Sequence, residues 1–475
     1  MLFNSMQFVF FFVAIVALYY ALPYKYRWVL LLAGSYYFYM CWNSKYIFLI
    51  VFSTLIDYFC GLRMSHHTER KKRRKYLLLS LFTNLGLLFT FKYFNFFSDS
   101  LNALFQKVDL SVKMPYLHVL LPVGISFYTF QTLSYTIDVY RGKIKPERHL
   151  GIFALYVAFF PELVAGPIER ASRLLPQFFR KIDFDDARVA SGLRLMLWGF
   201  FKKLVVADRL AIYVDAVYGN VDFHSGLTFI VATFFFAFQI YCDFSGYSDI
   251  AIGAARVLGY DLMKNFDRPY FALTIPEFWR RWHISLSTWF KDYLYIPLGG
   301  NRVSVPRMYL NLTVVFLVSG LWHGANWTFV IWGTIHGLYI VASKLTLAHR
   351  DALVKKLGIH SKVVYSSRIF FTFLLVLFSW IYFRADSLAS ANNIIAKIFS
   401  LHWGSLFIPA LDQFAYGLMA IAMLLFVDVL QERSSLSARL SAQPVYLRWL
   451  GYVSIAVVIL LMGVFNGSQF IYFQF

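Results

Sequence analysis

Two histidines in otherwise apolar stretches are the residues best suited to chemistry in this sequence. His323 lies in SGLWHGANW (319–327), between two strongly apolar runs, and His283 lies in FWRRWHISLS (278–287). A neutral imidazole, with an ordinary pKa of about 6.5, can accept a proton from an alcohol during acyl transfer. An ionisable side chain at membrane depth is costly, and by default it indicates a function. We therefore expect His323 to act in proton transfer, with His283 as a second catalytic residue.

The segment around His283 is expected to form an amphipathic or re-entrant helix. Thr274 and Glu277 have the spacing of a capping box, which predicts that a helix begins near Ile275. At about 100° per residue, Arg280 and His283 would share one face of a continuous helix. The residues expected to end this helix are Pro297, Gly299 and Gly300. Since the segment is too charged to face lipid, we expect it to present guanidinium and imidazole groups to a water-filled cavity.

Polar residues near the histidines are candidates for binding the donor or the acceptor. Arginines suit a phosphate-bearing acyl donor, because a guanidinium can bind phosphate through two hydrogen bonds. The predicted binding residues are Arg280, Arg281, Trp279, Asn326, Asp243 and Ser245. The segment QIYCDFSGYSD (239–249) also has a structural interpretation, slightly favoured, in which its buried carboxylates pair with arginines. His336 is interpreted as structural because it would face away from His323 on a continuous helix.

Other reaction classes find little support in the motifs. The sequence has neither HxxxH nor HExxH spacing, so no metal site is expected. It has no GxSxG element either, which leaves a triad hydrolase unsupported.

The composition places these residues in a membrane protein. Of the 475 residues, 59% are hydrophobic and 15% are charged, whereas soluble domains have about a quarter of their residues charged. A membrane-spanning helix needs about 20 mostly apolar residues. The net charge of +20 lies mostly in short loops, so no nucleic-acid partner is expected. The apolar runs that predict spans are 6–22, 28–42, 46–62, 76–97, 117–138, 190–218, 226–242, 308–322, 326–345, 366–383, 413–430 and 447–465.

The loops predict the topology. The strongly basic loop 63–75 is expected to be cytoplasmic, which places the N-terminus outside because three runs precede it. The first run has no positively charged flank before it and is expected to be a retained span. The run 151–160 is too short to span and meets Pro161, a pattern of re-entrant or interfacial segments. A span over 190–218 would have to shelter four charged residues inside the protein: Lys202, Lys203, Asp208 and Arg209.

Long motifs throughout the chain resemble the membrane-bound O-acyltransferase superfamily, most closely its bacterial alginate O-acetyltransferase type. They are DRPYFALTIPEFWRRWHISLSTWFKDYLYIPLGGNR (267–302), SGLWHGANW, YCDFSGYSDIAIGAARVLGY (241–260), FFPELVAGPIER (159–170), MLFNS (1–5) and FIYFQF (470–475). The resemblance implies an all-α polytopic membrane protein, with a ring of tilted transmembrane helices around a thin core. It also implies re-entrant or amphipathic helices, a central funnel or tunnel, and one integral membrane domain over residues 1–475.

The resemblance further implies an activity. His323 matches the family's near-invariant histidine and would be the general base or a transient acyl acceptor, while His283 matches a second, more variable polar position. Acetyl would pass from a cytoplasmic donor, acetyl-CoA, which is a substrate rather than a bound cofactor. The acceptor would be a hydroxyl of an extracytoplasmic polysaccharide such as alginate, in exopolysaccharide biosynthesis. The protein would contact lipid in the bacterial cytoplasmic (inner) membrane and act with an extracytoplasmic SGNH-like acetyltransferase partner.

Three alternatives remain open. The first is D-alanyl transfer toward teichoic acid, against which the N-terminal motif and the C-terminal spans favour acetylation. The second is a transporter for the polymer or the acyl donor, which would also contain charges inside the membrane. The lack of a visible inverted repeat argues mildly against that alternative. The third is a scaffold that only recruits a secreted acetyltransferase.

Overall fold

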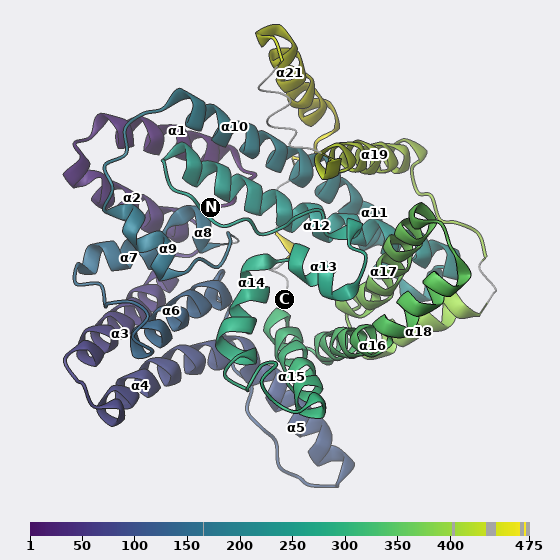
Figure 1. Cartoon of the computed structure of the whole chain (residues 1–475), viewed down its shortest axis with the longest axis horizontal. Coiled ribbons are helices and arrows are strands. Elements are labelled where there is room, and N and C mark those ends of the chain that lie inside the picture. The colour runs from purple at the N-terminus through teal and green to yellow at the C-terminus, as the bar shows by residue number, and fades with distance from the viewer. Residues whose placement is uncertain (165, 401–403, 434–442, 466–469, 472–475) are drawn as a thin grey trace. The chain divides into compact units, whose positions relative to one another are not determined.

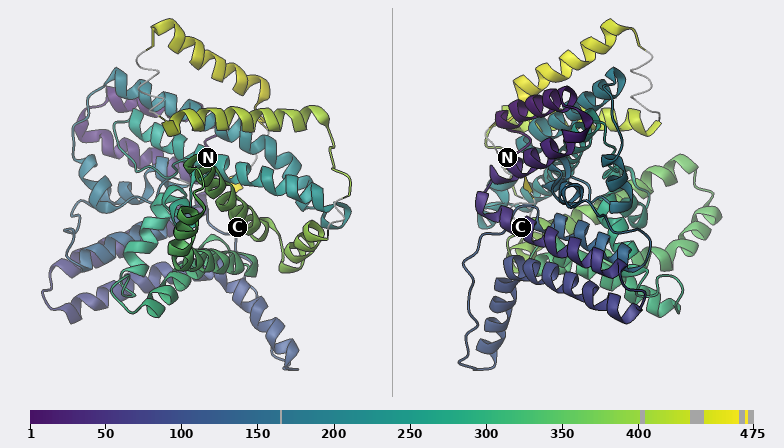
Figure 2. Two further views of the ribbon diagram at one scale, coloured as in Figure 1. Left: turned by 45° about the vertical axis from the view of Figure 1, so that its right-hand side comes forward. Right: turned by 90° about the vertical axis from the view of Figure 1, so that its left-hand side faces the viewer.

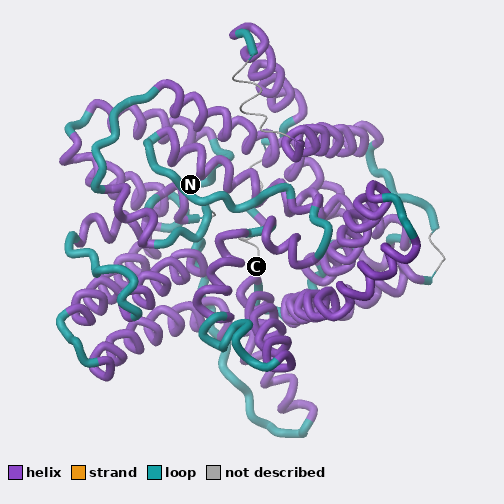
Figure 3. Tube along the Cα trace, viewed as in Figure 1, coloured by secondary structure: helices purple, strands orange, loops and turns teal. Residues whose placement is uncertain are grey.

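The protein consists of helices joined by loops in the computed structural model, which describes residues 1–164, 166–400, 404–433, 443–465 and 470–471 (Figure 3). No strand occurs within these ranges. The chain divides into two compact units, Met1–Leu193 with Ala251–Met263, and Arg194–Ile250 with Lys264–Phe475. The expectation of a single integral membrane domain stays a prediction.

The first unit holds most of the N-terminal helices (Figure 1). Its helices are α1 (Met6–Ala21), α2 (Tyr24–Met40), η1 (Ser44–Tyr46), α3 (Ile47–Ser65), α4 (Arg70–Leu88), η2 (Phe89–Tyr93), α5 (Phe94–Lys107), α6 (Ile125–Tyr140), α7 (Leu150–Ala158), α8 (Phe160–Leu163) and α9 (Ala171–Phe178). Polar side chains are buried between α3 and α4. There the Asp57 carboxylate accepts hydrogen bonds from Ser80 Oγ at 2.6 Å and from Asn84 Nδ2 at 2.9 Å. Because the carboxylate is hydrogen-bonded, it can be buried without an unsatisfied polar group.

Two helices contribute residues to both units, namely α10 (Asp186–Phe200) and α12 (Gly226–Val257). The second unit adds η3 (Phe201–Ala207), α11 (Asp208–Tyr218), η4 (Val221–Phe223), η5 (Pro269–Phe271), α13 (Ile275–Arg281), α14 (Ile284–Phe290), η6 (Lys291–Tyr295), α15 (Val305–His323), α16 (Trp327–Leu357), α17 (Ser361–Arg384), α18 (Leu388–Phe399), α19 (Leu411–Arg433) and α21 (Val445–Met462). Both views in Figure 2 show α21, in yellow, at the outer edge of this unit, where it contacts η3. Segments η2, η3 and η6 are π-helical, with wider turns than an α-helix.

Eight helices among the described residues are long and apolar enough to cross a membrane. They are Ser44–Ser65, Arg70–Lys107, Gly226–Val257, Val305–His323, Trp327–Leu357, Ser361–Arg384, Leu411–Glu432 and Val445–Met462. Each coincides with one of the runs predicted from the sequence, so the interpretation as a multi-pass membrane protein is confirmed.

The other predicted runs are helical but differ in extent or composition. Runs 6–22 and 28–42 correspond to α1 and α2, which have 16 and 17 residues. The run 117–138 was predicted wrongly at its start, because α6 begins only at Ile125, after Gly124 adopts a left-handed φ of 76°. The run 190–218 is the charged α10–η3–α11 segment, which is not among the eight spans.

The short segment before Pro161 does form a helix too short to span a membrane. Helix α7 has nine residues and α8 has four, with Pro161 in the first turn of α8. A proline there lacks only an N–H group that would have no partner within the helix.

The start of α13 confirms the predicted helix start and the Thr274 cap, whereas the Glu277 side chain reaches the residue before the cap instead of the cap itself. Thr274 Oγ1 accepts a hydrogen bond from Glu277 N at 3.2 Å, and Glu277 Oε2 accepts one from Leu273 N at 2.9 Å. Because the side chain satisfies an otherwise unpaired helix N–H, Thr274→Ala should lower the free energy of unfolding by about 1 kcal/mol. Thermal unfolding of the purified protein in detergent measures this loss. Thr346→Ala, inside α16, is the matched control and should not be destabilising; equal melting temperatures for the two variants would contradict the prediction.

Candidate active site

His323 is buried where α15 meets the start of α16. It is the last residue of α15 and is 1% exposed. The glycines around it allow close contact, as the sequence suggested. A Cβ on Gly320 would lie 2.2 Å from the Phe329 carbonyl oxygen, and a Cβ on Gly324 would lie 2.2 Å from the Phe329 ring. A larger residue at Gly320 would therefore push the α16 backbone away from α15, and one at Gly324 would displace the Phe329 ring.

Aromatic rings enclose the His323 imidazole. Its ring centroid lies 5.0 Å from that of Trp332, 5.1 Å from Trp322 and 5.5 Å from Phe383. The indole N–H groups of Trp332 and Trp380 are buried with no hydrogen-bond acceptor in the described part of the chain. Such donors are available to a polar group that enters the site.

His283 lies in a break between two short helices. It follows the end of α13 and precedes α14, in the left-handed conformation with φ 43° and ψ 55°. A residue other than glycine in this conformation is strained by about 1–3 kcal/mol, which the surrounding structure must offset. The His283 side chain is 0% exposed and packs against Phe244, with ring centroids 4.5 Å apart.

The tautomer of His283 follows from its contact with Asn265. Asn265 Oδ1 lies 3.2 Å from His283 Nδ1 and accepts a hydrogen bond from the backbone N–H of Ser285, also at 3.2 Å. Because a backbone N–H can only donate, the shared atom must be the amide oxygen and not the nitrogen. His283 Nδ1 therefore carries the proton, and Nε2 keeps a lone pair that can accept one.

The two histidines lie close together in the interior. Their ring centroids are 6.4 Å apart, which makes the pair the candidate site. His283 lies outside the eight spans, and burial lowers the pKa of its imidazole. His283 is therefore neutral at physiological pH and suited to hydrogen bonding or proton acceptance.

The predicted face shared by Arg280 and His283 is wrong. Arg280 is exposed whereas His283 is buried, because α13 ends at Arg281 and the helix does not continue through His283. The backbone leaves the helix to pair with a second segment, since Ile284 N donates to Asn265 O at 2.8 Å. The role of Arg280 in binding a donor stays a prediction.

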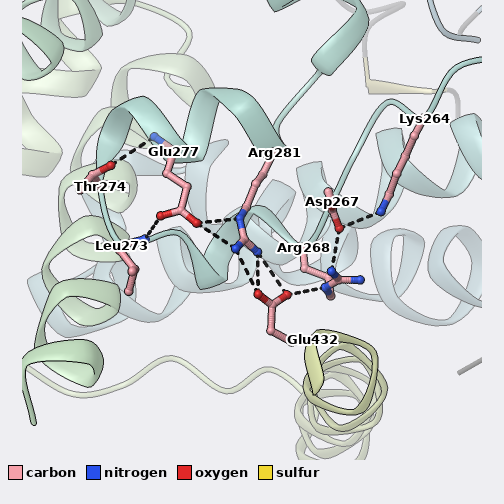
Figure 4. A network of polar contacts seen from close by, with 8 residues as sticks. All are labelled: Lys264, Asp267, Arg268, Leu273, Thr274, Glu277, Arg281 and Glu432. Atoms are coloured by element: carbon pink, nitrogen blue, oxygen red, sulfur yellow. Dashed lines mark hydrogen bonds and ion pairs between the residues drawn. The ribbon is translucent and has the colours of Figure 1, made fainter. Parts of the chain in front are cut away.

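Arg281 is held by carboxylates (Figure 4). Its guanidinium contacts Glu432 through two nitrogens at 3.1 Å each, and it contacts Glu277 at 2.8 Å. The prediction that Arg281 presents its guanidinium to a cavity is therefore wrong, because Glu432 and Glu277 already bind that group.

Trp279, His336 and Asn326 make structural contacts. Trp279 Nε1 donates to His336 Nδ1 at 3.3 Å, and His336 Nε2 lies 2.9 Å from Ser379 Oγ. His336 is thus hydrogen-bonded through both ring nitrogens, as its structural interpretation requires. Asn326 caps α16 by accepting a hydrogen bond from Thr328 N at 3.0 Å. Contact of Trp279 or Asn326 with a substrate stays a prediction.

Asp243 and Ser245 belong to a buried cluster around two lysines. Lys203 Nζ lies 2.6 Å from Asp243 and 2.8 Å from Asp208, while Lys202 Nζ donates to Ser245 Oγ at 3.0 Å. The partners of these carboxylates are thus lysines rather than the arginines we expected. Of the four charges that a span over 190–218 would have to shelter, Lys203 and Asp208 pair with each other. Lys202 pairs with Asp249 at 2.6 Å, and Arg209 donates to Gln413 and to the Met462 carbonyl oxygen, so the partners of these two lie outside the segment. Opposite charges offset the cost of burial.

Sequence reasoning missed Asn265 and Glu432. Asn265 has no local signal beyond its place two residues before the motif that begins at Asp267. Glu432 and Asp428 lie four residues apart in an apolar span, a spacing that places both on one helix face. That spacing could have revealed Asp428 and Glu432, but not Asn265. Within the described ranges, no group of three or more His, Cys, Asp or Glu residues could hold a metal ion.

The eight spans define a multi-pass membrane protein, and the buried pair of His283 and His323 is its candidate site. Residues 32–385 match the sequence model of a protein family, MBOAT, the membrane-bound O-acyltransferase family. The chain belongs to this family and is an acyltransferase. His283 and His323 lie within the matched region, whereas α18, α19 and α21 follow it.

Curated relatives cover most of the chain. A probable alginate O-acetylase AlgI of Azotobacter vinelandii is 43% identical over 84% of this chain and 78% of its own length. A probable alginate O-acetylase AlgI of Pseudomonas putida is 42% identical over 84% of this chain and 80% of its own. A peptidoglycan O-acetyltransferase of Helicobacter pylori is 36% identical over 86% of this chain and 81% of its own.

Proposed function

We propose that the protein transfers acetyl from cytoplasmic acetyl-CoA to hydroxyl groups of an extracytoplasmic polysaccharide, alginate or a similar polymer. The observation that carries the proposal is the buried pair of His283 and His323, 6.4 Å apart, in a member of an acyltransferase family. The names of the relatives support acetyl as the group and a cell-envelope polymer as the acceptor. The protein acts in the bacterial cytoplasmic membrane with its N-terminus outside, together with an SGNH-like partner protein.

In the proposed reaction His323 is the general base. Its neutral imidazole removes the proton of the acceptor hydroxyl while that oxygen attacks the thioester carbonyl. The new C–O bond forms, the C–S bond breaks, and the departing thiolate takes the proton from the imidazolium to give CoA. His283, oriented by Asn265, holds the reacting group through Nε2. A transient acyl-His323 would divide the same transfer into two steps.

The test uses membrane vesicles that contain the full chain and acetyl-CoA labelled in the acetyl group. Alginate is the acceptor, with and without the partner protein, and both are supplied on the extracytoplasmic side, which is the lumen of inverted vesicles. Inverted vesicles, whose cytoplasmic face is outside, should move label from CoA to alginate or to the partner. Right-side-out vesicles should not use external acetyl-CoA.

The alternatives predict other results. A transporter would move the intact donor into the vesicle without covalent transfer, and a D-alanyltransferase would ignore acetyl-CoA and use a D-alanyl carrier. Either result would overturn acetyl transfer. A scaffold would give label on alginate that does not depend on His323.

A further inference from the structure

Helix α19 carries two carboxylates, Asp428 and Glu432, at one end of an apolar span. Ionisable residues in such helices are costly and are typically retained for a specific contact. Because α19 follows the region 32–385 that matches the family model, the likeness to the family assigns these residues no part in the site.

Glu432 holds two guanidinium groups from separate segments (Figure 4). One carboxylate oxygen lies 2.6 Å from Arg268 Nε, and the other lies 3.1 Å from Arg281 Nη1. The three side chains are 20–23% exposed, so water screens their charges only in part. Glu432 is therefore a bridge between the residues before η5 and the end of α13.

The hydrogen bond that orients His283 joins the same two segments. Asn265 lies in the residues before η5, and His283 follows the end of α13. Asp267 N donates to Arg281 O, and Ile284 N donates to Asn265 O, each at 2.8 Å. The two backbone hydrogen bonds lie on either side of His283 in the sequence. They hold it against Asn265, whose side-chain oxygen fixes its tautomer.

The backbone on both sides of this bridge is strained. His283 and Arg268 adopt left-handed conformations, with φ values of 43° and 44°. Residues other than glycine persist in this region only where surrounding contacts enforce it. Arg268 is bound by Glu432 directly, and Arg281, two residues before His283, is bound by the same carboxylate.

We propose that Glu432 is a positioning residue for acyl transfer. From α19 it clamps the segments that carry Asn265 and His283, and it thereby keeps the His283 imidazole in the orientation that Asn265 sets. This inference rests on the proposed function of the two histidines. Glu432 makes no contact with the reacting groups in this scheme, so its loss should affect the rate of the chemical step rather than donor binding.

The first test compares Glu432→Gln with the wild type as full-length protein. The amide keeps the size but loses the charge that holds two arginines, so kcat for acetyl transfer should fall by about tenfold, with little change in KM for acetyl-CoA. Glu432→Asp should recover part of the rate. Asp412→Asn is the matched control, because Asp412 is exposed on the same helix and lies outside this network. Full kcat in Glu432→Gln, with active wild type, would overturn the proposal.

The second test distinguishes positioning from a general loss of stability. Glu432→Gln and Asn265→Ala are combined, and kcat is measured per folded, monodisperse protein. If Glu432 acts through Asn265, the double variant should be no slower than the slower single variant. Multiplication of the two single effects would overturn the proposal. Failure of the proposed function appears differently, as wild-type protein that transfers no acetyl at all.

Discussion

Replacement of His323 by Ala or Gln should lower acetyl transfer by about 10²- to 10⁴-fold, the usual contribution of a general base. The reason is that, of the rings of Trp322, Trp332, Phe383 and His283, which contact His323, only the His283 imidazole also has a basic nitrogen. The measurement is the rate at which label leaves acetyl-labelled CoA for the polymer, per amount of purified protein. The Gln variant keeps a polar group in the buried site and guards against loss of folding in the Ala variant.

His336→Gln is the matched control for His323. His336 is equally buried, but its two ring nitrogens are hydrogen-bonded to Trp279 and Ser379. Its replacement should lower thermal stability and leave the rate per folded molecule largely unchanged. Near-normal acetylation by His323→Gln would remove the general-base assignment.

Removal of the His283 imidazole should reduce acetyl transfer by about 10²-fold. To test the imidazole alone, the substituted residue must keep the left-handed backbone conformation of this position. Glycine and asparagine tolerate the left-handed conformation of this position, whereas alanine is disfavoured there. His283→Gly and His283→Asn therefore keep the break between α13 and α14 and remove only the imidazole. His283→Ala completes the set, and the rate per folded protein is measured for all three variants.

The three variants give distinct patterns for distinct roles. If the imidazole matters, Gly, Asn and Ala variants should all be slow. If His283 serves only to form the break, Gly and Asn variants should be as active as the wild type and Ala alone should be slow. The second pattern would reduce His283 to a structural residue.

Local rules predicted the helices well because their signals lie within a few residues. The apolar runs gave all eight spans, and the Thr274–Glu277 spacing predicted the start of α13. Both depend on hydrophobicity or on contacts between residues i and i+3. The two histidines could be singled out because an ionisable group between apolar runs is conspicuous in the sequence alone.

The geometry of the site could not be predicted in this way because it depends on distant residues. At the break, His283 and Ile284 contact Asn265, 18 residues earlier, and nothing in FWRRWHISLS marks this partner. Arg281 was expected to face a cavity, but it is bound by Glu432, 151 residues away. Periodicity assigns faces correctly only while a helix continues, and tertiary contacts decide where it stops.

The number of residues in the π-helical segment η3 sets the rotation of the helix that follows it, α11. A π-turn closes with one residue more than an α-turn, so it advances the register of everything that follows by one position, or about 100° of rotation. Lys203 lies within η3, and its partner Asp208 opens α11. Removing a single residue from 201–207 would turn α11 about its own axis and take Asp208 away from Lys203. For this stretch, the number of residues is therefore a requirement in addition to the identity of its two lysines.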